Sequence, residues 1–281
     1  MTALSLGLIA ALCWGIHDVT IRKISQTAPL MATLLGVLLT GAVFQIGVML
    51  VTDGFTALPP QAVYLSIAAG VAFLIASTSL YGAFHRGPVR IVAPVIGSYP
   101  ILSVGWAALG GATVTPFQWL AVFAVVAGIA IVSVFSDDTE TQYPPKLPTI
   151  LLSIAAAFGF FSTFALGHEA ARIADDLPSI LITRVTSILL LLPVFPILSL
   201  PFWPGRSAVP FIAVMGILDG IALLCVLSAG SLPSPQYAAV SSSVFGMITV
   251  ILAWALLRER LTSAQWIGCA VAFSGIGYLA L

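Results

Sequence analysis

The chain has 281 residues, of which 60% are hydrophobic and only 7% charged, and its mean hydropathy is +1.13. Soluble domains carry about 25% charged residues, so this composition excludes a protein whose whole surface faces water. Ten Lys and Arg balance ten Asp and Glu, which leaves no basic face for nucleic acid. We therefore expect an integral, multi-pass membrane protein that contacts the lipid bilayer.

Proline, glycine and charged residues divide the chain into ten apolar segments. Each has a length near the roughly 20 residues that a helix needs to cross the hydrocarbon core. The runs are nearly continuous, whereas barrel strands alternate over short segments. We predict an all-α integral membrane fold with ten transmembrane helices, at 3–21, 29–51, 61–84, 91–110, 117–135, 149–167, 178–199, 208–230, 236–257 and 263–281.

An internal repeat divides the chain into residues 1–135 and 149–281, joined by a polar loop at 136–148. Gln118-Trp119 precedes Gln265-Trp266 by 147 residues, and Gly87-Pro88 precedes Ser234-Pro235 by the same offset. Two halves with five spans each must lie in opposite orientations. Such inverted repeats are typical of secondary transporters, whose substrate site lies near the midplane between the repeats.

Two segments carry a family resemblance. The second half contains Leu257-Arg258-Glu259-Arg260-Leu261 and Gln265-Trp266-Ile267-Gly268, and the first span contains Ala10-Ala11-Leu12-Cys13-Trp14-Gly15. The chain thereby resembles the drug/metabolite transporter superfamily, EamA type. This resemblance implies two inverted five-helix halves, a central cavity lined by helices 1, 3, 4, 6, 8 and 9, and alternating access. Gly110-Gly111-Ala112 stands where the family usually has an acidic residue, so Glu259 has no counterpart in the first half.

Charge and resemblance predict opposite orientations in the membrane. The positive-inside rule places the basic odd-numbered connections in the cytoplasm and both termini outside. The resemblance implies that both termini lie in the cytoplasm. The charge rule and the resemblance therefore agree only that the two termini lie on the same side of the membrane. The even-numbered connections hold only Arg172, whereas the odd-numbered ones hold Arg22, Lys23, Arg86, Arg90, Lys146, Arg206, Arg258 and Arg260.

Asp219 lies near the middle of span 8, between Gly216 and Gly220. A charge at the bilayer centre costs about 2.5–3.5 kcal/mol on insertion scales, so such a residue is a candidate for function. We expect Asp219 to face a polar cavity, where it binds substrate or carries a coupled proton. The alternative is a structural tie to a neighbour such as Arg184. Arg184 itself has three open roles: snorkelling to the interface, a salt bridge, or a clamp on a substrate carboxylate or phosphate.

Span 1 contains Trp14, His17 and Asp18. Trp14 and Asp18 are four residues apart and share a helix face, so they could hold a cationic group by ring face and carboxylate. His17 is a candidate for proton coupling, because histidine titrates near physiological pH. His17 and Asp18 point about 100° apart, so we do not expect both on one line of the cavity. The alternative for Asp18 is an ordinary helix end at the membrane surface.

Aromatic and hydroxyl side chains complete the predicted substrate site. Aromatic residues of membrane helices often serve packing or the interfacial belt instead, and that alternative stays open. The residues are Tyr81, Tyr99, Tyr237, Ser241 and Phe245.

Two further patterns concern helix packing. Pro94 and Pro100 interrupt span 4 and free backbone carbonyls, which makes this span a gate candidate. Spans 5 and 10 carry small residues at helical spacing, which predicts tight packing and offers a homodimer contact through these spans. The small residues are Ala121, Gly128, Gly268, Ala272 and Gly275.

The sequence thus predicts a secondary-active transporter of a small amino-acid-like or amine-containing metabolite, in a bacterial inner (cell) membrane. Alternatives are a multidrug or organic-cation exporter of the same family, a non-transporting membrane subunit, and a membrane enzyme. We expect no enzyme activity, because no nucleophile–base constellation is visible. We expect no cofactor and no metal site, because the three histidines lie in separate segments without Cys at ligand spacing.

Overall fold

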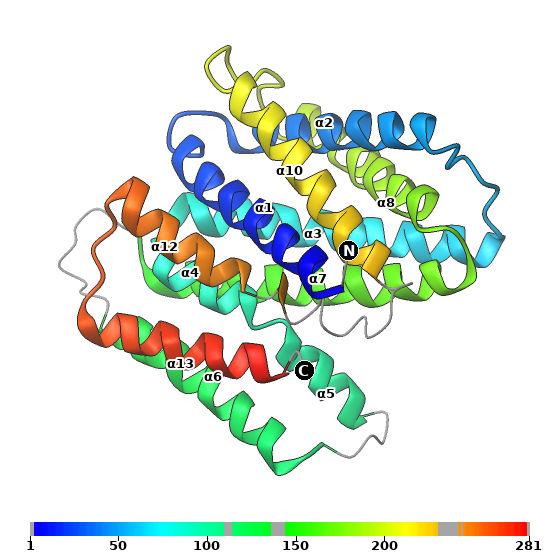
Figure 1. Cartoon of the computed structure of the whole chain (residues 1–281). Coiled ribbons are helices and arrows are strands. Elements are labelled where there is room, and N and C mark those ends of the chain that lie inside the picture. Colours follow the sequence, from blue (N-terminus) through cyan, green and yellow to red (C-terminus); the bar gives the residue numbers. More distant parts are fainter. Residues whose placement is uncertain (1–2, 110–113, 136–143, 230–240, 243, 280–281) are drawn as a thin grey trace.

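The computed structural model describes residues 3–109, 114–135, 144–229, 241–242 and 244–279 (Figure 1). The secondary structure elements in these ranges are helices. The first half contains α1 (Ala3–Ile24), α2 (Leu30–Val51), α3 (Pro60–Arg86), α4 (Val89–Gly97), α5 (Pro100–Leu109) and α6 (Pro116–Val134). Prolines begin α3, α5 and α6, where the missing amide proton costs no helical hydrogen bond.

The second half contains α7 (Lys146–Ile173), α8 (Asp176–Leu191), α9 (Val194–Ile197), α10 (Val209–Ser228), α12 (Phe245–Leu257) and α13 (Ser263–Leu279). Predicted span 7 divides into α8 and α9 at Pro193. Helix α7 continues past the predicted end of span 6 at residue 167. The boundaries of the two domains stay a prediction, because most of the loop at 136–148 lies outside the described residues.

The predicted interruption of span 4 occurs at Pro100 and not at Pro94. Pro94 lies inside α4, whereas Ser98 and Tyr99 separate α4 from α5. The ring of a proline disfavours helical backbone at the residue before it, so Tyr99 leaves the helix. Span 4 therefore consists of two short helices with a joint at Tyr99.

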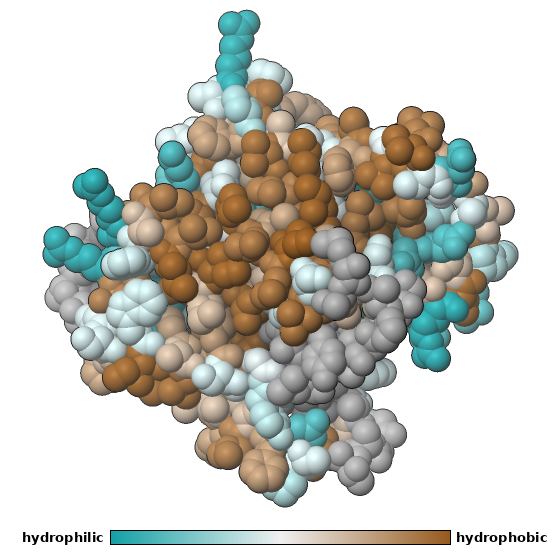
Figure 2. Space-filling view, in the orientation of Figure 1, coloured by the Kyte–Doolittle hydropathy of each residue, from teal (hydrophilic) through white to brown (hydrophobic). Residues whose placement is uncertain are grey.

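Six helical segments are long and apolar enough to cross a membrane: α1, α2, α3, α7, α8 with α9, and α10. Helices α6 and α12 are apolar but shorter in the described part. The outer surface of the bundle is largely hydrophobic (Figure 2). Val43, Tyr64 and Phe123, for example, are each more than two-thirds exposed. An apolar outer surface over helices with internally bonded backbones is what contact with lipid requires.

The helices pack across the two halves in matched pairs. Helix α1 packs on α10 and α12, and its counterpart α7 packs on α3 and α4. Helix α2 packs on α10, and its counterpart α8 packs on α3. Exchange of partners between equivalent elements is the pattern that a twofold axis produces. The packing thus fits the predicted pair of inverted five-helix repeats.

Two glycine contacts repeat this symmetry at the level of residues. A Cβ atom at Gly70 of α3 would lie 2.7 Å from the carbonyl oxygen of Thr183 in α8. A Cβ atom at Gly216 of α10 would lie 2.8 Å from the carbonyl oxygen of Val37 in α2. Each glycine and its carbonyl partner has its counterpart 146 residues away. The two halves therefore use the same close contact, once in each direction.

Tight packing of spans 5 and 10 is confirmed, and it occurs within one chain. Helices α6 and α13 lie side by side at one edge of the bundle (Figure 1). A Cβ atom at Gly128 would lie 2.5 Å from the carbonyl oxygen of Gly268, and one at Gly275 would lie 2.7 Å from that of Ala121. The small residues thus face each other inside the chain. A homodimer through these spans stays a prediction that would have to use their outer faces.

Candidate functional site

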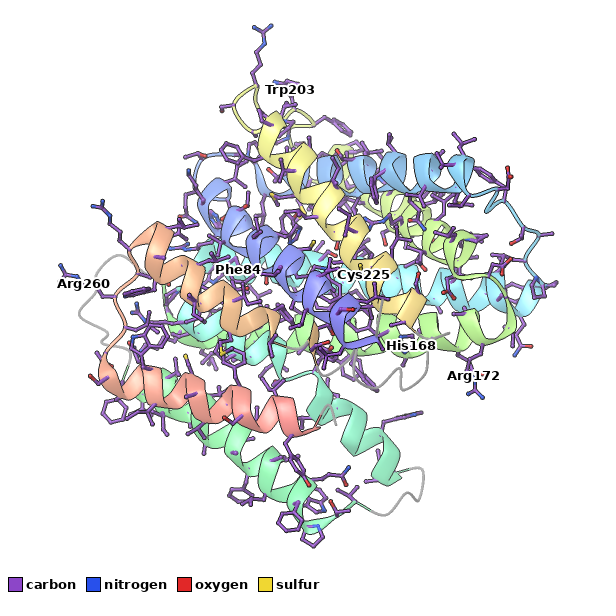
Figure 3. The ribbon with its side chains drawn as sticks, in the orientation of Figure 1. Phe84, His168, Arg172, Trp203, Cys225 and Arg260 are labelled. Carbon is purple, nitrogen blue, oxygen red and sulfur yellow. The ribbon has the colours of Figure 1, made fainter. Side chains whose placement is uncertain are left out.

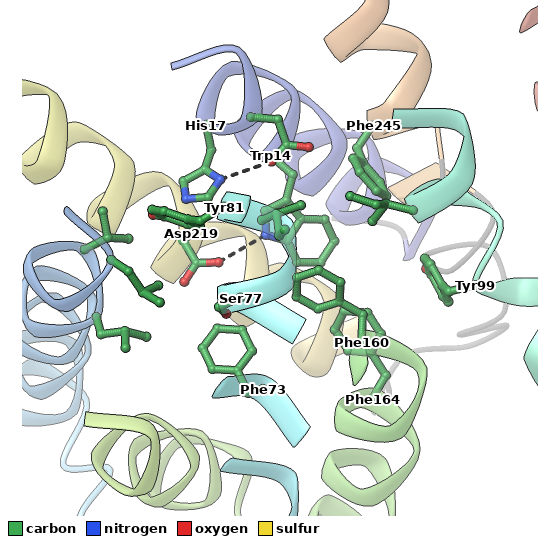
Figure 4. Close-up of a pocket in the computed structure, with 16 residues that line it drawn as sticks. Trp14, His17, Phe73, Ser77, Tyr81, Tyr99, Phe160, Phe164, Asp219 and Phe245 are labelled. Atoms are coloured by element: carbon green, nitrogen blue, oxygen red, sulfur yellow. Dashed lines mark hydrogen bonds and ion pairs between the residues drawn. The ribbon is translucent and has the colours of Figure 1, made fainter. Parts of the chain in front are cut away.

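A cavity lies between the two halves. Its lining comes from α1, α3, α4, α7, α10 and α12, as the resemblance implies, and also from α2 and from Tyr99 at the joint of span 4. Most lining side chains are apolar, and the ionisable ones are His17, Asp18, Tyr81, Tyr99 and Asp219 (Figure 4).

Asp219 and Arg184 form a buried ion pair beside this cavity. The Oδ2 atom of Asp219 lies 2.7 Å from the Nη2 atom of Arg184, and the Arg184 side chain is fully buried. The indole nitrogen of Trp14 donates to Oδ1 of Asp219 at 3.3 Å (Figure 4). Snorkelling of Arg184 is therefore wrong, because its charge is compensated inside the protein. Of the roles predicted for Arg184, the salt bridge is the one that the structure contains.

Glycines make room for this ion pair. The Arg184 guanidinium packs against the backbone of α2 at Gly41, where any Cβ atom would clash with it. Gly216 lies against the α2 backbone, and Gly220 lies against the ring of Phe44. The glycines that flank Asp219 thus bring α10 close to α2 and leave no space there for a substrate.

His17 and Asp18 form a second buried pair, at 3.2 Å between Nδ1 and Oδ1. Both line the cavity and are at least nine-tenths buried. The cavity extends around α1 far enough for adjacent side chains to reach it. The surface alternative for Asp18 is wrong, because α1 continues to Ile24. Neither Nε2 of His17 nor Oδ2 of Asp18 has a hydrogen-bond partner.

Aromatic rings form much of the remaining wall (Figure 4). The ring centroid of Trp14 lies 5.9 Å from that of Phe164 and 6.0 Å from that of Phe245. The ring centroid of Tyr99 lies 5.6 Å from that of Phe164. The ring of Tyr81 lies 6.3 Å from that of His17, and its buried hydroxyl has no hydrogen-bond partner. The cavity is therefore an aromatic chamber with unpaired polar atoms on its α1 and α3 sides.

Among the described residues, two predicted site residues, Arg184 and Ser241, do not line this cavity. The Ser241 hydroxyl donates to the carbonyl of Leu4 at 2.9 Å, which ties it to the beginning of α1. Tyr237 lies outside the described residues. Sequence reasoning missed Phe73, Phe160 and Phe164, which line the cavity.

Signals for these three aromatics were present in the sequence. Phe160 and Phe164 are four residues apart and share one helix face. Phe73 is offset from Asp219 by 146 residues, so the repeat places it at the equivalent position. Both signals depend on the repeat or on helical spacing, and neither requires the structure.

A second cavity of about 460 Å³ adjoins the first. It shares Phe73 and Phe164 with the first cavity and extends along α8 past Thr183 to Asp176, at the beginning of that helix. Together the two cavities reach from the His17–Asp18 pair toward one end of the bundle.

At the opposite end of the bundle, Glu259 of the second half contacts residues of the first half. Its Oε2 atom accepts a hydrogen bond from the amide of Val89 at 3.0 Å, and its Oε1 atom lies 3.5 Å from Nε of Arg22. Arg258, in the left-handed conformation that ends α12, turns the chain at this point. Burial raises the pKa of Glu259, and the charges of Arg22 and Arg90 oppose that rise. This Glu259 clasp connects the second half to the beginning of α4.

Charged residues outside these clusters lie at the periphery. Figure 3 shows Arg172 and Arg260 extending away from the bundle. The Nη1 atom of Arg172 lies 3.4 Å from Oε2 of Glu169, and both side chains are mostly exposed. Within the described residues, His, Cys, Asp and Glu side chains do not gather in threes that could hold a metal ion.

An all-helical membrane protein with two inverted halves and buried charges around a central cavity has the architecture of a secondary transporter. The family model described as the EamA-like transporter family matches residues 1–134 and again residues 147–281. The chain therefore belongs to the EamA-like transporter family, which confirms the resemblance and the ten-helix inverted-repeat fold. One solved structure, described only as the crystal structure of a protein, is 19% identical and has a TM-score of 0.70. The similarity covers 98% of this chain and 94% of that one, and it shows the common fold. Comparison with curated proteins gives no match.

Proposed function

We propose that this protein transports a small amino-acid-like or amine-containing metabolite across a bacterial inner membrane by secondary-active, alternating access. The observation that carries this proposal is the cavity between the halves, which brings the His17–Asp18 pair and the Asp219–Arg184 pair together. Four ionisable side chains in an otherwise apolar interior are costly. Such groups are expected where they bind a polar solute that must cross the membrane.

Alternating access requires the two ends of the bundle to open in turn. The Glu259 clasp would hold one end closed, and its contacts with Val89 and Arg22 would have to break when that end opens. The joint at Tyr99 would let α4 and α5 move relative to each other, because it interrupts the helical hydrogen bonds of span 4. His17, Asp18 and Asp219 are the groups available for proton coupling.

The proposal is tested by counterflow in proteoliposomes. Vesicles containing the purified full chain are loaded with an excess of unlabelled phenylalanine or phenethylamine, and entry of the labelled compound is followed. We expect protein-dependent entry of at least one compound. An imposed pH gradient should change the rate if protons are coupled. Entry that equals that of empty vesicles for both compounds would contradict the proposal for amino-acid-like and amine substrates.

Variants of Asp219 separate transport from structure. Asp219→Asn removes the charge that faces Arg184 and Trp14, so we expect counterflow to fall sharply, whereas Asp53→Asn in an exposed loop serves as the matched control. Size-exclusion chromatography of each purified variant checks folding. Full-rate counterflow by folded Asp219→Asn would show that Asp219 is a structural tie rather than part of the transport site.

A further inference from the structure

We infer that the cavity binds a monocationic amine on an apolar or aromatic body through Asp18, and that it rejects a substrate carboxylate. This inference rests on the proposed function, because it names the substrate class of the same site. The charged groups around the cavity differ in whether a protein side chain compensates them.

The cationic group next to the cavity, the Arg184 guanidinium, is already paired with the Asp219 carboxylate. The Arg184 guanidinium is fully buried, lies 2.7 Å from Asp219 and packs on the α2 backbone at Gly41. The side chain also lies over the ring of Phe73, at 6.0 Å from its centroid. The Nε and Nη1 atoms of Arg184 have no hydrogen-bond partner, but Nη1 faces the α2 backbone at Gly41, and Arg184 is not among the residues that line the cavity. A carboxylate in the cavity would reach Arg184 only if this packing opened.

Asp18 has the opposite property. One of its oxygens contacts His17, and the other, Oδ2, has no hydrogen-bond partner although the residue is 3% exposed. Thr249 lies within hydrogen-bonding reach of this carboxylate, but its single hydroxyl hydrogen is donated to the carbonyl of Phe245 at 2.8 Å. An unpaired carboxylate oxygen in an apolar interior is strongly unfavourable. An ammonium group supplies the donors and the positive charge that this oxygen lacks.

The charges that face Asp18 define its preference. His17 on α1, Tyr81 on α3 and Asp219 on α10 line the same cavity, and Arg184 on α8 compensates Asp219. The carboxylates of Asp18 and Asp219 and the guanidinium of Arg184 sum to one negative charge. A single cation neutralises this charge, whereas a zwitterion would leave its own carboxylate uncompensated beside two carboxylates.

The aromatic wall suits the remainder of such a substrate. The ring centroid of Trp14 lies 5.9 Å from that of Phe164 and 6.0 Å from that of Phe245, and all three rings line the same cavity as Asp18. A cation near an aromatic face gains about 0.5–2 kcal/mol, with the larger value where water is excluded. The same faces provide apolar contact for the body that carries the amine. Cation recognition and apolar packing are thus available in one chamber.

Four probes with the same phenyl body test the inference. Phenethylamine is a cation, phenylalanine a zwitterion, 3-phenylpropionate an anion and 2-phenylethanol a neutral alcohol. Isothermal titration of each into the purified full chain at neutral pH measures the four affinities. We expect phenethylamine to bind at least tenfold more tightly than each of the other three. Equal or tighter binding of phenylalanine or 3-phenylpropionate, or no binding of phenethylamine, would overturn the inference.

Variants assign the preference to Asp18. In Asp18→Asn, the affinity for phenethylamine should fall to that of 2-phenylethanol, whereas binding of 2-phenylethanol should stay unchanged. Asp53→Asn, which removes an exposed carboxylate, should preserve the full preference. If Asp18→Asn does not fold, the ranking of the four probes on the unchanged protein decides the question. An unchanged preference in folded Asp18→Asn would overturn the assignment.

Counterflow distinguishes this inference from the proposed function. Protein-dependent counterflow of phenylalanine without tighter binding of the amine would keep transport and overturn the monocation preference. Tight binding of phenethylamine without counterflow of either compound would keep the preference and contradict transport.

Discussion

The two halves of the protein share one framework and differ in their charges. Arg184 and Asp219 of the second half have Leu38 and Phe73 as their counterparts at the 146-residue offset. The glycine contacts that position these helices are the same in both halves. The two copies therefore share their packing, whereas the first has two apolar residues at the positions where the second has the buried ion pair. Packing defines the architecture, and a few substitutions within it define the chemistry.

The largest expected effect comes from breaking the ion pair on one side only. Arg184→Leu and Asp219→Phe each copy the first half and leave the other charge buried without its partner. We expect each single variant to lower the free energy of unfolding by about 3–5 kcal/mol. The double variant should recover most of this loss, because a buried ion pair can often be replaced by apolar residues at little cost.

Chemical denaturation in detergent micelles measures these three variants against the unchanged protein. A double variant as unstable as the single ones would contradict the comparison, since the cost would then arise from side-chain shape rather than from an unpaired charge. The double variant retains Asp18, so we expect it still to bind phenethylamine. This measurement separates the role of the ion pair from that of Asp18.

A smaller, symmetric effect is expected at the matched glycines. A Cβ atom at Gly70 or at Gly216 would meet a carbonyl oxygen of the facing helix at less than 3.0 Å. Overpacking of this kind costs about 1–3 kcal/mol. We therefore expect Gly70→Ala and Gly216→Ala to destabilise the protein by similar amounts. Gly47→Ala is the control, because nothing lies within 4 Å of its Cβ position. A strong effect at only one of the matched glycines would show that the halves are not packed equivalently.

The smallest expected effect concerns the Glu259 clasp, for which the first half has Ala112 at the 147-residue offset. Burial raises the pKa of Glu259. The folded protein therefore binds a proton more readily than the unfolded chain, so stability falls as the pH rises through this raised pKa. Glu259→Gln should remove this part of the pH dependence. Denaturation at a series of pH values measures it, and an unchanged dependence in the variant would contradict the prediction.

The sequence predicted those features that depend on spacing along a single helix or on the repeat. Small residues at Gly128 and Gly275 indicated the contact between α6 and α13, because close helix packing leaves no room for side chains. The break of span 4 was correctly expected, although only Pro100 causes it. Whether an internal proline such as Pro94 ends a helix depends on neighbouring helices, which the sequence alone does not show.

Pairing between distant side chains was harder to predict. The role of Arg184 stayed open between three alternatives, because snorkelling, a salt bridge and a substrate clamp all require the same residue type. His17 and Asp18 were both expected at the site, but their contact with each other was not, since helical geometry gives directions and not the width of the cavity. The free oxygen of Asp18 could be recognised only after the hydrogen bonds around it were known.

The exchange of partners between the halves bears on biosynthesis. The most extensive helix packings, such as α3 on α7 and α1 on α10, join helices from different halves. The first five spans therefore cannot complete their packing when they leave the translocon, because the surfaces they need have not been synthesised. The first five spans must therefore stay in the bilayer with incomplete packing until the last five spans insert between and beside them. Separately expressed halves should accordingly be stable only when both are produced in the same cell.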